Sequence, residues 1–200
     1  MFRKCTVLVG VLALLLVVPQ AHAAKGEWMI NFNGGTGIPL SSFKDAAKLG
    51  FMGGVGADYM VTEALAIGVD GSYMTNSGSD ALEAALTAIA GVPVTAKFNT
   101  INGGAHAKYM FPMSGEGKIS PYVVGGAGMY NFKAKIESGG VSADNSENKV
   151  GGHGGLGFLY KASDKVGVGL EGAFHLISTT GGSTKYATVQ AVVSVGMGSK

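Results

Sequence analysis

The stretch GVGADYMVTEALAIGVDGSYM, residues 54–74, decides the class of fold. Apolar residues alternate with small or polar ones in both halves, so Val55 and Tyr59 share one face, as do Ile67 and Val69. Alternation with a period of two is typical of a β-strand, whose successive side chains point to opposite faces. The four residues in the middle, VTEA, predict a short turn. The stretch therefore predicts two antiparallel strands joined by a tight connection.

The same alternation continues along the chain in segments of about ten residues. Their shared faces carry these residues: Trp28, Ile30 and Phe32; Phe51, Val55, Ala57 and Tyr59; Leu65, Ile67, Val69 and Tyr73; Ile101, Ala105, Ala107, Tyr109 and Phe111; Tyr122, Val124, Tyr130 and Phe132; Leu156, Phe158 and Tyr160; Val166, Val168, Leu170, Phe174 and Leu176; Ala187, Val189, Ala191, Val193, Val195 and Met197. Between them, long connections alternate with short ones, the long ones over 38–48, 75–95, 138–149 and 178–184 and the short ones over 61–64, 112–118 and 162–165. This alternation is typical of membrane barrels. We predict an all-β fold, an eight-stranded antiparallel up-and-down transmembrane β-barrel, closed so that no strand edge is left unpaired in lipid.

Residues 1–23 are expected to be a cleaved secretory signal peptide. A basic N-terminus precedes an apolar run over 6–18, and Ala21 and Ala23 form a small-x-small cleavage site. The run is shorter than the roughly 20 residues that a membrane-spanning helix needs. The barrel domain would then cover residues 24–200.

Composition after cleavage excludes several classes of protein. The leader contains Arg3, Lys4 and Cys5, the chain's one cysteine, so we expect no disulfide and no cysteine-based metal site. The remaining thirteen basic residues are all lysine and are balanced by thirteen Asp and Glu. A balanced charge without arginine argues against nucleic acid as a partner. The 34 glycines accompany a mean hydropathy of +0.29, which indicates a folded chain that tolerates glycine within strands rather than a disordered one.

A soluble eight-stranded barrel of the lipocalin kind, acting as a periplasmic binder, is the alternative, because alternation alone does not say which face is inside. Aromatic residues near strand ends favour the membrane version, where they form girdles at the lipid interfaces. The aromatic residues expected there are Trp28, Tyr59, Tyr73, Tyr109, Tyr122, Tyr130, Tyr160 and Phe174. Glycines on the opposite face suit the narrow interior of a small closed barrel better than a ligand cavity.

The mature chain resembles the small OmpA-like and OmpX-like outer-membrane barrels over nearly all of residues 26–198. The segments that carry the resemblance are 54–74, ISPYVVGGAGMYNF (119–132) and GLGFLYKASDKVGVGLEGAFHL (155–176). The resemblance implies a place in the cell outer membrane, insertion by the barrel assembly machinery and contact with outer-membrane lipid. It also implies a non-enzymatic role in envelope structure or surface interaction, with a surface ligand or host protein bound by the loops. OmpW-like relatives suggest an alternative, a small pore for passive transport of solutes, which many inward glycines would favour.

Seven polar side chains are expected to face the interior. They are Asp58, Asp70, His106, Lys108, His153, Glu171 and His175. We predict that they form a lumenal polar network in which pairing offsets the cost of burying charge. The three histidines belong to three different strands, and no carboxylate stands at a fixed short spacing from them, so no metal site is expected.

One glycine motif and one His/Ser pair are candidates for chemistry, and we reject both. GGHGGLG at 151–157 matches GxGxxG, but Leu156 and Phe158 continue in strand period and no helix follows to receive a phosphate. Lipid A deacylases among the small barrels carry His-x-Ser-Asn. Here His175 and Ser178 are three residues apart, so in a strand their side chains point to opposite faces. No catalytic residue and no cofactor are therefore expected.

The connection over 75–95 contains a helical signal. Asp80 and Glu83 form a capping-box arrangement, and Gly91 followed by Pro93 ends the helix. Two interpretations remain open: a helix that packs over the barrel rim or lies at the membrane interface, and an exposed binding element or lid over the lumen.

Overall fold

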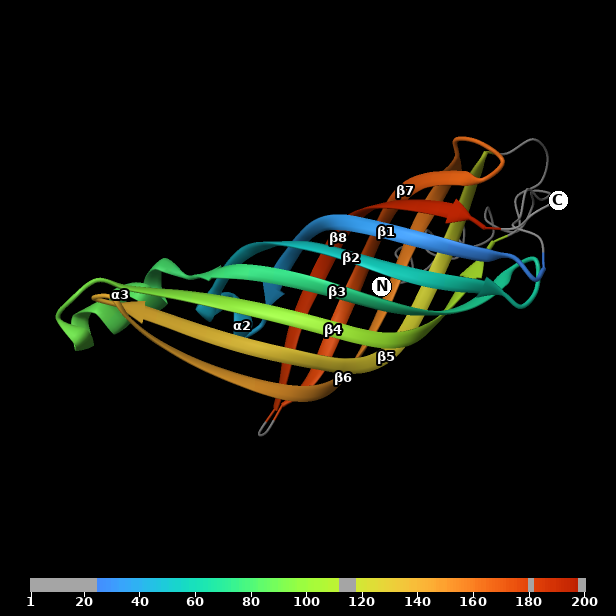
Figure 1. The fold of residues 1–200 in the computed structure, drawn as a ribbon. Helices are drawn as coiled ribbons and strands as arrows, with labels where there is room; N and C mark the ends of the chain where they lie inside the picture. The colour runs from blue at the N-terminus through green and yellow to red at the C-terminus, as the bar shows by residue number, and fades with distance from the viewer. Residues whose placement is uncertain (1–24, 112–117, 180–181, 198–200) are drawn as a thin grey trace, which may run out of the picture.

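The computed structural model describes residues 25–111, 118–179 and 182–197, so the expected signal peptide lies outside the described residues. The described residues form one closed antiparallel barrel of eight strands, in which each strand pairs with the next and β8 pairs with β1 (Figure 1). The prediction of an eight-stranded up-and-down barrel is confirmed. Within these ranges, no helix has both the length and the apolar character to cross a membrane.

The elements follow one another in a simple order. They are β1 (Trp28–Leu40), α2 (Phe43–Ala46), β2 (Ala47–Met60), β3 (Leu65–Gly78), α3 (Asp80–Ala90), β4 (Val94–Met110), β5 (Ile119–Ser138), β6 (Val141–Lys161), β7 (Val166–Thr179) and β8 (Gly182–Gly196). Short connections, including 61–64 and 162–165, lie at the end that we call the turn end. Both helices lie toward the opposite end, the loop end, where β4, β5 and β6 rise beyond the other strands (Figure 1).

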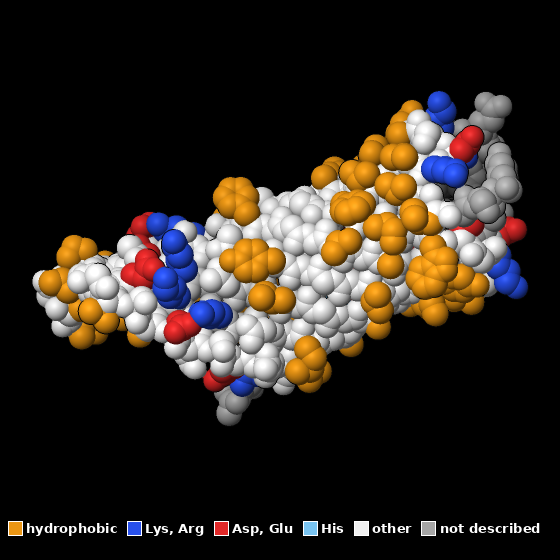
Figure 2. Space-filling view, in the orientation of Figure 1, with side chains coloured by type: hydrophobic (Ala, Val, Ile, Leu, Met, Phe, Trp, Pro, Cys, Tyr) orange, Lys and Arg blue, Asp and Glu red, His pale blue; other side chains and the backbone are white. Residues whose placement is uncertain are grey.

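The outer wall of the barrel is apolar. Large exposed hydrophobic side chains on this wall include Phe32, Phe51, Val55, Ile67, Val69, Ile101, Val123, Met129, Leu156, Leu170, Val189 and Val193. On the face that Figure 2 shows, charged side chains gather toward the two ends, and the wall between them carries none. An apolar band between two polar ends is the surface that a membrane-spanning barrel presents to lipid.

The interior has the opposite character. Asp58 is fully buried, and Lys108 is only 5% exposed. A lipocalin places its apolar face inside and its charged face in water, so this barrel is inverted relative to a soluble one. The alternative of a soluble periplasmic binder therefore does not agree with the structure.

The prediction of a long connection over 138–149 is wrong. β5 continues to Ser138 and β6 begins at Val141, which leaves a two-residue turn. Gly139 and Gly140 occupy that turn with φ of +54° and +85°, left-handed values that a tight hairpin needs and that glycine adopts without strain. Polar sequence suggested a loop, but strands that rise beyond the lipid are wet on both faces and need no apolar face.

The same correction applies to the connection predicted over 178–184. β7 runs to Thr179 and β8 begins at Gly182, and Ser178 pairs with Ser183. Serine and threonine hide the strand pattern here because their small polar side chains are accepted on either face.

Helix α3 forms where predicted, but its first capping residue differs. Ser79, not Asp80, is the N-cap, and its Oγ accepts a hydrogen bond from the Leu82 N–H at 3.2 Å. Ser79 has the extended backbone that a capping residue needs, whereas Asp80 already lies in the helix and pairs with Lys48 at 2.6 Å. Gly91 ends the helix in the left-handed conformation, as predicted.

Candidate functional site

The interior of the barrel is built in three layers along its axis. An apolar cluster closes the turn end, with Met29, Met60, Ala66, Met110, Tyr122, Val124, Leu159 and Val192. A second apolar cluster closes the loop end, with Phe43, Ala47, Met74, Tyr130, Ile177 and Tyr186. The polar side chains lie between the two. Eight strands enclose an interior just wide enough for side chains to fill, which agrees with this layering.

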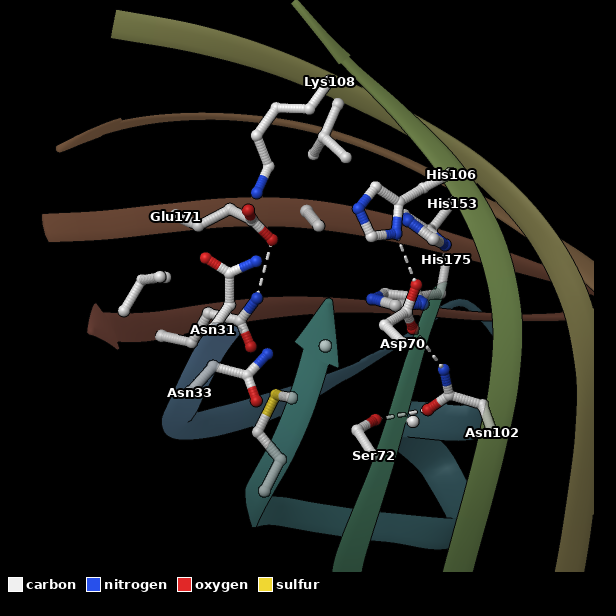
Figure 3. A pocket seen from close by; sticks show the side chains of 17 residues that line it. Asn31, Asn33, Asp70, Ser72, Asn102, His106, Lys108, His153, Glu171 and His175 are labelled. Atoms are coloured by element: carbon white, nitrogen blue, oxygen red, sulfur yellow. Dashed lines mark hydrogen bonds and ion pairs between the residues drawn. The ribbon is translucent and has the colours of Figure 1, made fainter. Parts of the chain in front are cut away.

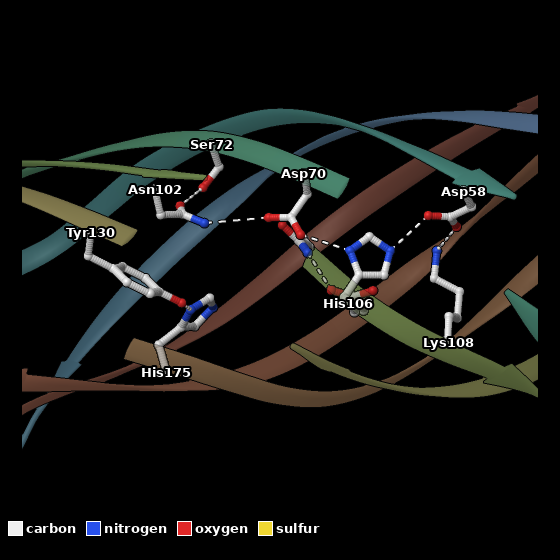
Figure 4. Close-up of polar contacts among 10 residues, drawn as sticks. Asp58, Asp70, Ser72, Asn102, His106, Lys108, Tyr130 and His175 are labelled. Carbon is white, nitrogen blue, oxygen red and sulfur yellow. Dashed lines mark hydrogen bonds and ion pairs between the residues drawn. The ribbon is translucent and has the colours of Figure 1, made fainter. Parts of the chain in front are cut away.

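One part of the polar layer is a chain of charged groups (Figure 4). Lys108 Nζ donates to Asp58 Oδ2 at 2.5 Å, and Asp58 Oδ1 lies 2.8 Å from His106 Nε2. The other ring nitrogen of His106 lies 2.8 Å from Asp70 Oδ1, so one imidazole joins two carboxylates. Asn102 Nδ2 donates to the second oxygen of Asp70 at 3.5 Å. Each carboxylate thus has at least two polar partners, which offsets the cost of taking its charge out of water.

The bridge from Asp58 to His106 spans a glycine. Asp58 belongs to β2 and His106 to β4, and Gly68 of β3 lies between them in the register. A Cβ atom on Gly68 would lie 2.8 Å from His106 Nε2. Glycine at this position therefore lets two side chains meet over the strand that separates them.

Two further groups complete the polar layer. Glu171 accepts hydrogen bonds from Tyr122 Oη at 2.9 Å and from Gln190 Nε2 at 2.6 Å. His175 Nδ1 lies 3.2 Å from the hydroxyl of Tyr130. Lys108 Nζ lies 5.3 Å from the ring centre of Tyr122, so its ammonium group connects the Glu171 group to the chain of charged side chains.

Tyr122 and Tyr130 point into the lumen, so their predicted place at the lipid interface is wrong. Each is only 1% exposed, and the outward face of β5 carries Ile119, Val123 and Met129 instead. A Cβ on Gly157 would lie 2.6 Å from the Tyr122 ring, and one on Gly151 would lie 2.8 Å from the Tyr130 ring. The glycines of β6 thus leave the space that the rings fill. Both faces of β5 are apolar or small, so alternation could not identify the inner one.

The other predicted interface aromatics lie on the outer surface. They are Trp28, Tyr59, Tyr73, Tyr109, Tyr160 and Phe174. The rings of Trp28 and Tyr59 are in contact, with centroids 5.2 Å apart. Our sequence interpretation missed Tyr186, which is buried and stacks on His175 with ring centroids 4.3 Å apart. Tyr186 lies two residues before Thr188 and four before Gln190, so the three share the inward face of β8. This shared parity with two polar residues is the signal that could have identified it.

The three inward histidines form a row without the geometry of a metal centre. The rings of His153 and His175 lie 5.4 Å apart on paired positions of β6 and β7, and those of His106 and His153 lie 6.4 Å apart. In the parts of the chain that the structure describes, no group of three or more His, Cys, Asp or Glu is placed to hold a metal ion. His175 is buried and Ser178 is exposed, so the two do not form a nucleophile and base pair.

Little space remains in the polar layer. A cavity of about 70 Å³ lies between the network and β1, beside Asn31 and Asn33 (Figure 3). It has room for a few water molecules and not for a solute. The expectation that inward glycines open the lumen is wrong, because a Cβ on Gly155 would lie 2.6 Å from the carbonyl oxygen of Gly172. Such glycines mark a close approach of strands instead of free space.

Helix α2 supplies the lid that was considered for α3. Phe43 is 8% exposed, and its ring meets those of Phe98 and Phe132 edge-on at 5.8 and 5.4 Å. The sequence interpretation placed only a loop there. Helix α3 instead stands beyond the barrel end, and none of its residues is buried (Figure 1). Of the two interpretations for α3, the structure favours the exposed element.

The chain matches one family model, described as outer membrane protein beta-barrel domain, over residues 10–196. A sequence search of curated proteins found no match.

Among solved structures, Neisserial surface protein A is similar with a TM-score of 0.57 and 20% identity, over 84% of this chain and 96% of that one. Ail, the attachment invasion locus protein of Yersinia pestis, was solved in complex with the heparin analogue sucrose octasulfate; its TM-score is 0.56 with 13% identity, over 85% of this chain and 98% of that one. A major outer membrane protein from Thermus thermophilus has a TM-score of 0.51 with 10% identity, over 85% of this chain and 99% of that one. At these identities the likeness establishes the fold.

Proposed function

Since the chain belongs to the outer membrane protein beta-barrel domain family, we propose that it is a non-enzymatic anchor whose loop-end elements serve envelope structure or surface interaction. The proposal includes export by the signal peptide over 1–23, insertion by the barrel assembly machinery, and contact of the aromatic residues on the outer wall with the lipid interfaces. It places activity outside the membrane instead of within the lumen.

The observation that carries this proposal is the filled interior. Apolar clusters close both ends of the barrel, and the polar layer between them leaves a cavity of about 70 Å³. A pore for passive transport needs a continuous water path, and the lumenal side chains argue against one. Helix α3 at the loop end has no such packing role, since it buries none of its residues.

The fold neighbours give a choice of probe. Ail is named for attachment and invasion and was crystallised with a heparin analogue, which makes sulfated sugars a sensible ligand to test on this chain. Three loop-end lysines, Lys44, Lys97 and Lys185, are suitable partners for such an anion.

The experiment removes the loop-end elements and keeps the barrel. One variant replaces residues 79–93 by a two-residue Asn-Gly turn, and a second deletes 134–145 so that β5 and β6 close in a shorter hairpin. A control variant replaces Glu63 in a turn-end connection by Ala. Cells that carry each form are assayed for binding of sucrose octasulfate and host-cell surfaces and for sensitivity to detergent.

We expect the trimmed variants to lose binding or detergent resistance, while the control matches the parent. Heat-modifiable gel migration reports that each barrel is folded. If the trimmed barrels, and a barrel in which Lys44, Lys97 and Lys185 are replaced by Gln, are folded and both properties equal those of the parent, the proposal is wrong.

A further inference from the structure

The polar layer of the barrel carries more negative than positive charge. Between the two apolar clusters, the described residues include three carboxylates, of Asp58, Asp70 and Glu171, and one ammonium group, of Lys108. Both ring nitrogens of His106 lie 2.8 Å from carboxylate oxygens. Ionised carboxylates only accept hydrogen bonds, so both nitrogens donate and the ring carries a positive charge. Three negative charges then face two positive ones.

The charge without a cationic partner lies on Glu171. The two aspartates share the ammonium group and the imidazolium ring through the chain of charged groups. Glu171 instead accepts hydrogen bonds from the neutral groups of Tyr122 and Gln190, one on each oxygen. Among the described residues, no basic side chain forms an ion pair with it. Enclosing an ionised carboxylate without a cation costs much more free energy than enclosing it with one.

Buried oxygen atoms without hydrogen-bond donors belong to the side chains beside this carboxylate. Asn31 and Gln190 line the cavity of about 70 Å³ together with Glu171 (Figure 3), and they are only 9% and 6% exposed. The amide nitrogen of Gln190 donates to Glu171, which fixes the orientation of the amide group. No donor among the described residues reaches Gln190 Oε1 or Asn31 Oδ1. The cavity is therefore lined by a carboxylate and by two amide side chains whose oxygens have no donor.

A cation satisfies both the oxygen atoms and the charge. Water molecules can donate to the oxygens, but they are neutral and leave the carboxylate unbalanced. Alkali ions bind oxygen ligands, and carbonyl oxygens can replace their hydration shell. The surplus is a single negative charge, which a monovalent ion balances and a divalent ion would exceed. A bare alkali ion is as small as a water molecule, so it fits a cavity that is too small for an organic solute.

We propose that this cavity binds one monovalent alkali cation, such as sodium or potassium, through the carboxylate of Glu171 and the amide oxygens of Asn31 and Gln190. The apolar clusters separate the site from both ends of the barrel, so ions in the surrounding solution screen the carboxylate only weakly. The bound ion is a structural part of the lumen. It stabilises the closed barrel and does not pass through it.

A proton on His153 is the competing way to balance the charge. His153 also lines the cavity, and its ring lies 6.4 Å from that of His106 and 5.4 Å from that of His175. A second positive ring at this distance from the His106 imidazolium would be repelled by it. An ion that binds beside Glu171 balances the charge without placing two cationic rings together.

The test measures urea unfolding of the full barrel in nonionic detergent micelles at about pH 8, where an unperturbed histidine is neutral. Sodium chloride or potassium chloride is exchanged against N-methylglucamine chloride at constant ionic strength, and this organic cation is too large for the cavity. A ligand that binds only the folded state raises the folding equilibrium constant in proportion to its concentration once it exceeds the Kd. For the parent we expect an increase of about tenfold for each tenfold rise in one of the alkali ions.

Glu171→Gln removes the charge and keeps the shape of the side chain. Its folding equilibrium constant should be the same in all three salts. Asp80→Asn is the matched control, because it removes a carboxylate charge at the exposed loop end and should respond to the salts as the parent does. Heat-modifiable migration reports that each variant is folded.

The proposal is overturned if the parent has the same folding equilibrium constant in all three salts, a result that would favour the proton on His153. It is also overturned if Glu171→Gln responds to alkali ions as the parent does. The comparison of salts on the parent needs no variant, so it decides the question even if Glu171→Gln does not fold. Both outcomes leave the proposed function intact, because its elements lie at the loop end.

Discussion

Removing the carboxylate of Asp58 should be among the most damaging single changes in the barrel. Asp58→Ala leaves the ammonium group of Lys108, which is 5% exposed, without its carboxylate at 2.5 Å, and His106 keeps only Asp70. Removing one partner of a buried ion pair costs roughly 3–5 kcal/mol of unfolding free energy, because the other charge remains desolvated. Replacing both groups by apolar residues of similar size, as in Asp58→Leu with Lys108→Met, should recover most of that loss.

Urea unfolding in detergent micelles measures the effect, and the single tryptophan, Trp28, reports it by fluorescence from the outer wall. Asp80→Ala is the matched control, because it breaks an ion pair of similar length, 2.6 Å to Lys48, at the exposed loop end. It should leave the unfolding midpoint nearly unchanged. A loss below about 1 kcal/mol for Asp58→Ala, or a double variant no better than the single one, would refute the account of the lumenal network.

Three further predictions concern the wall and the lumen. Gly157→Val should lower the unfolding free energy by about 1–3 kcal/mol in the same assay, because its Cβ would meet the ring of Tyr122 at 2.6 Å. Gly154→Ala on the outer wall should be tolerated. Equal losses for the two variants would contradict the assignment of inner and outer faces. In lipid vesicles, Val69→Lys should lower the unfolding free energy by about 2–4 kcal/mol, and Thr95→Lys at the loop end should leave it nearly unchanged. Equal losses would contradict the assignment of the apolar band to the lipid. In planar bilayers the purified barrel should give no stable conductance, since the lumen is filled; a reproducible conductance step would favour the pore.

Alternation predicted the strands well wherever one face is apolar and the other polar. In β3, Ile67 and Val69 face out and Asp70 faces in. A shift by one residue would turn the apolar side chains into the lumen and Asp70 toward lipid, so the alternation allows one orientation of the strand. In β5 the sequence offers Tyr122 on one face and Val123 on the other, with glycine and alanine on both. Nothing local distinguishes the two faces there, and the glycines of β6 decide which one receives the rings.

The inward direction of the lumenal residues was predictable, but their partners were not. His106 and Asp58 are both inward by parity, yet they meet only because the registers of β2 with β3 and of β3 with β4 bring them to one level over Gly68. Contacts of this kind depend on the stagger of the whole sheet, which no single segment encodes. The lid residue Phe43 was missed for a similar reason, because four residues of helix have too little periodicity to recognise.

Thiol labelling on whole cells tests most directly the central claim, that an apolar belt crosses the outer membrane and holds the loop end outside. In a Cys5→Ser background the chain has no other cysteine, so Val141→Cys, Glu63→Cys and Val69→Cys report the loop end, the turn end and the belt. A membrane-impermeant maleimide should label Val141→Cys on intact cells, Glu63→Cys only after the outer membrane is permeabilised, and Val69→Cys only in detergent. Labelling of Glu63→Cys but not Val141→Cys on intact cells, or of Val69→Cys without detergent, would contradict the claim.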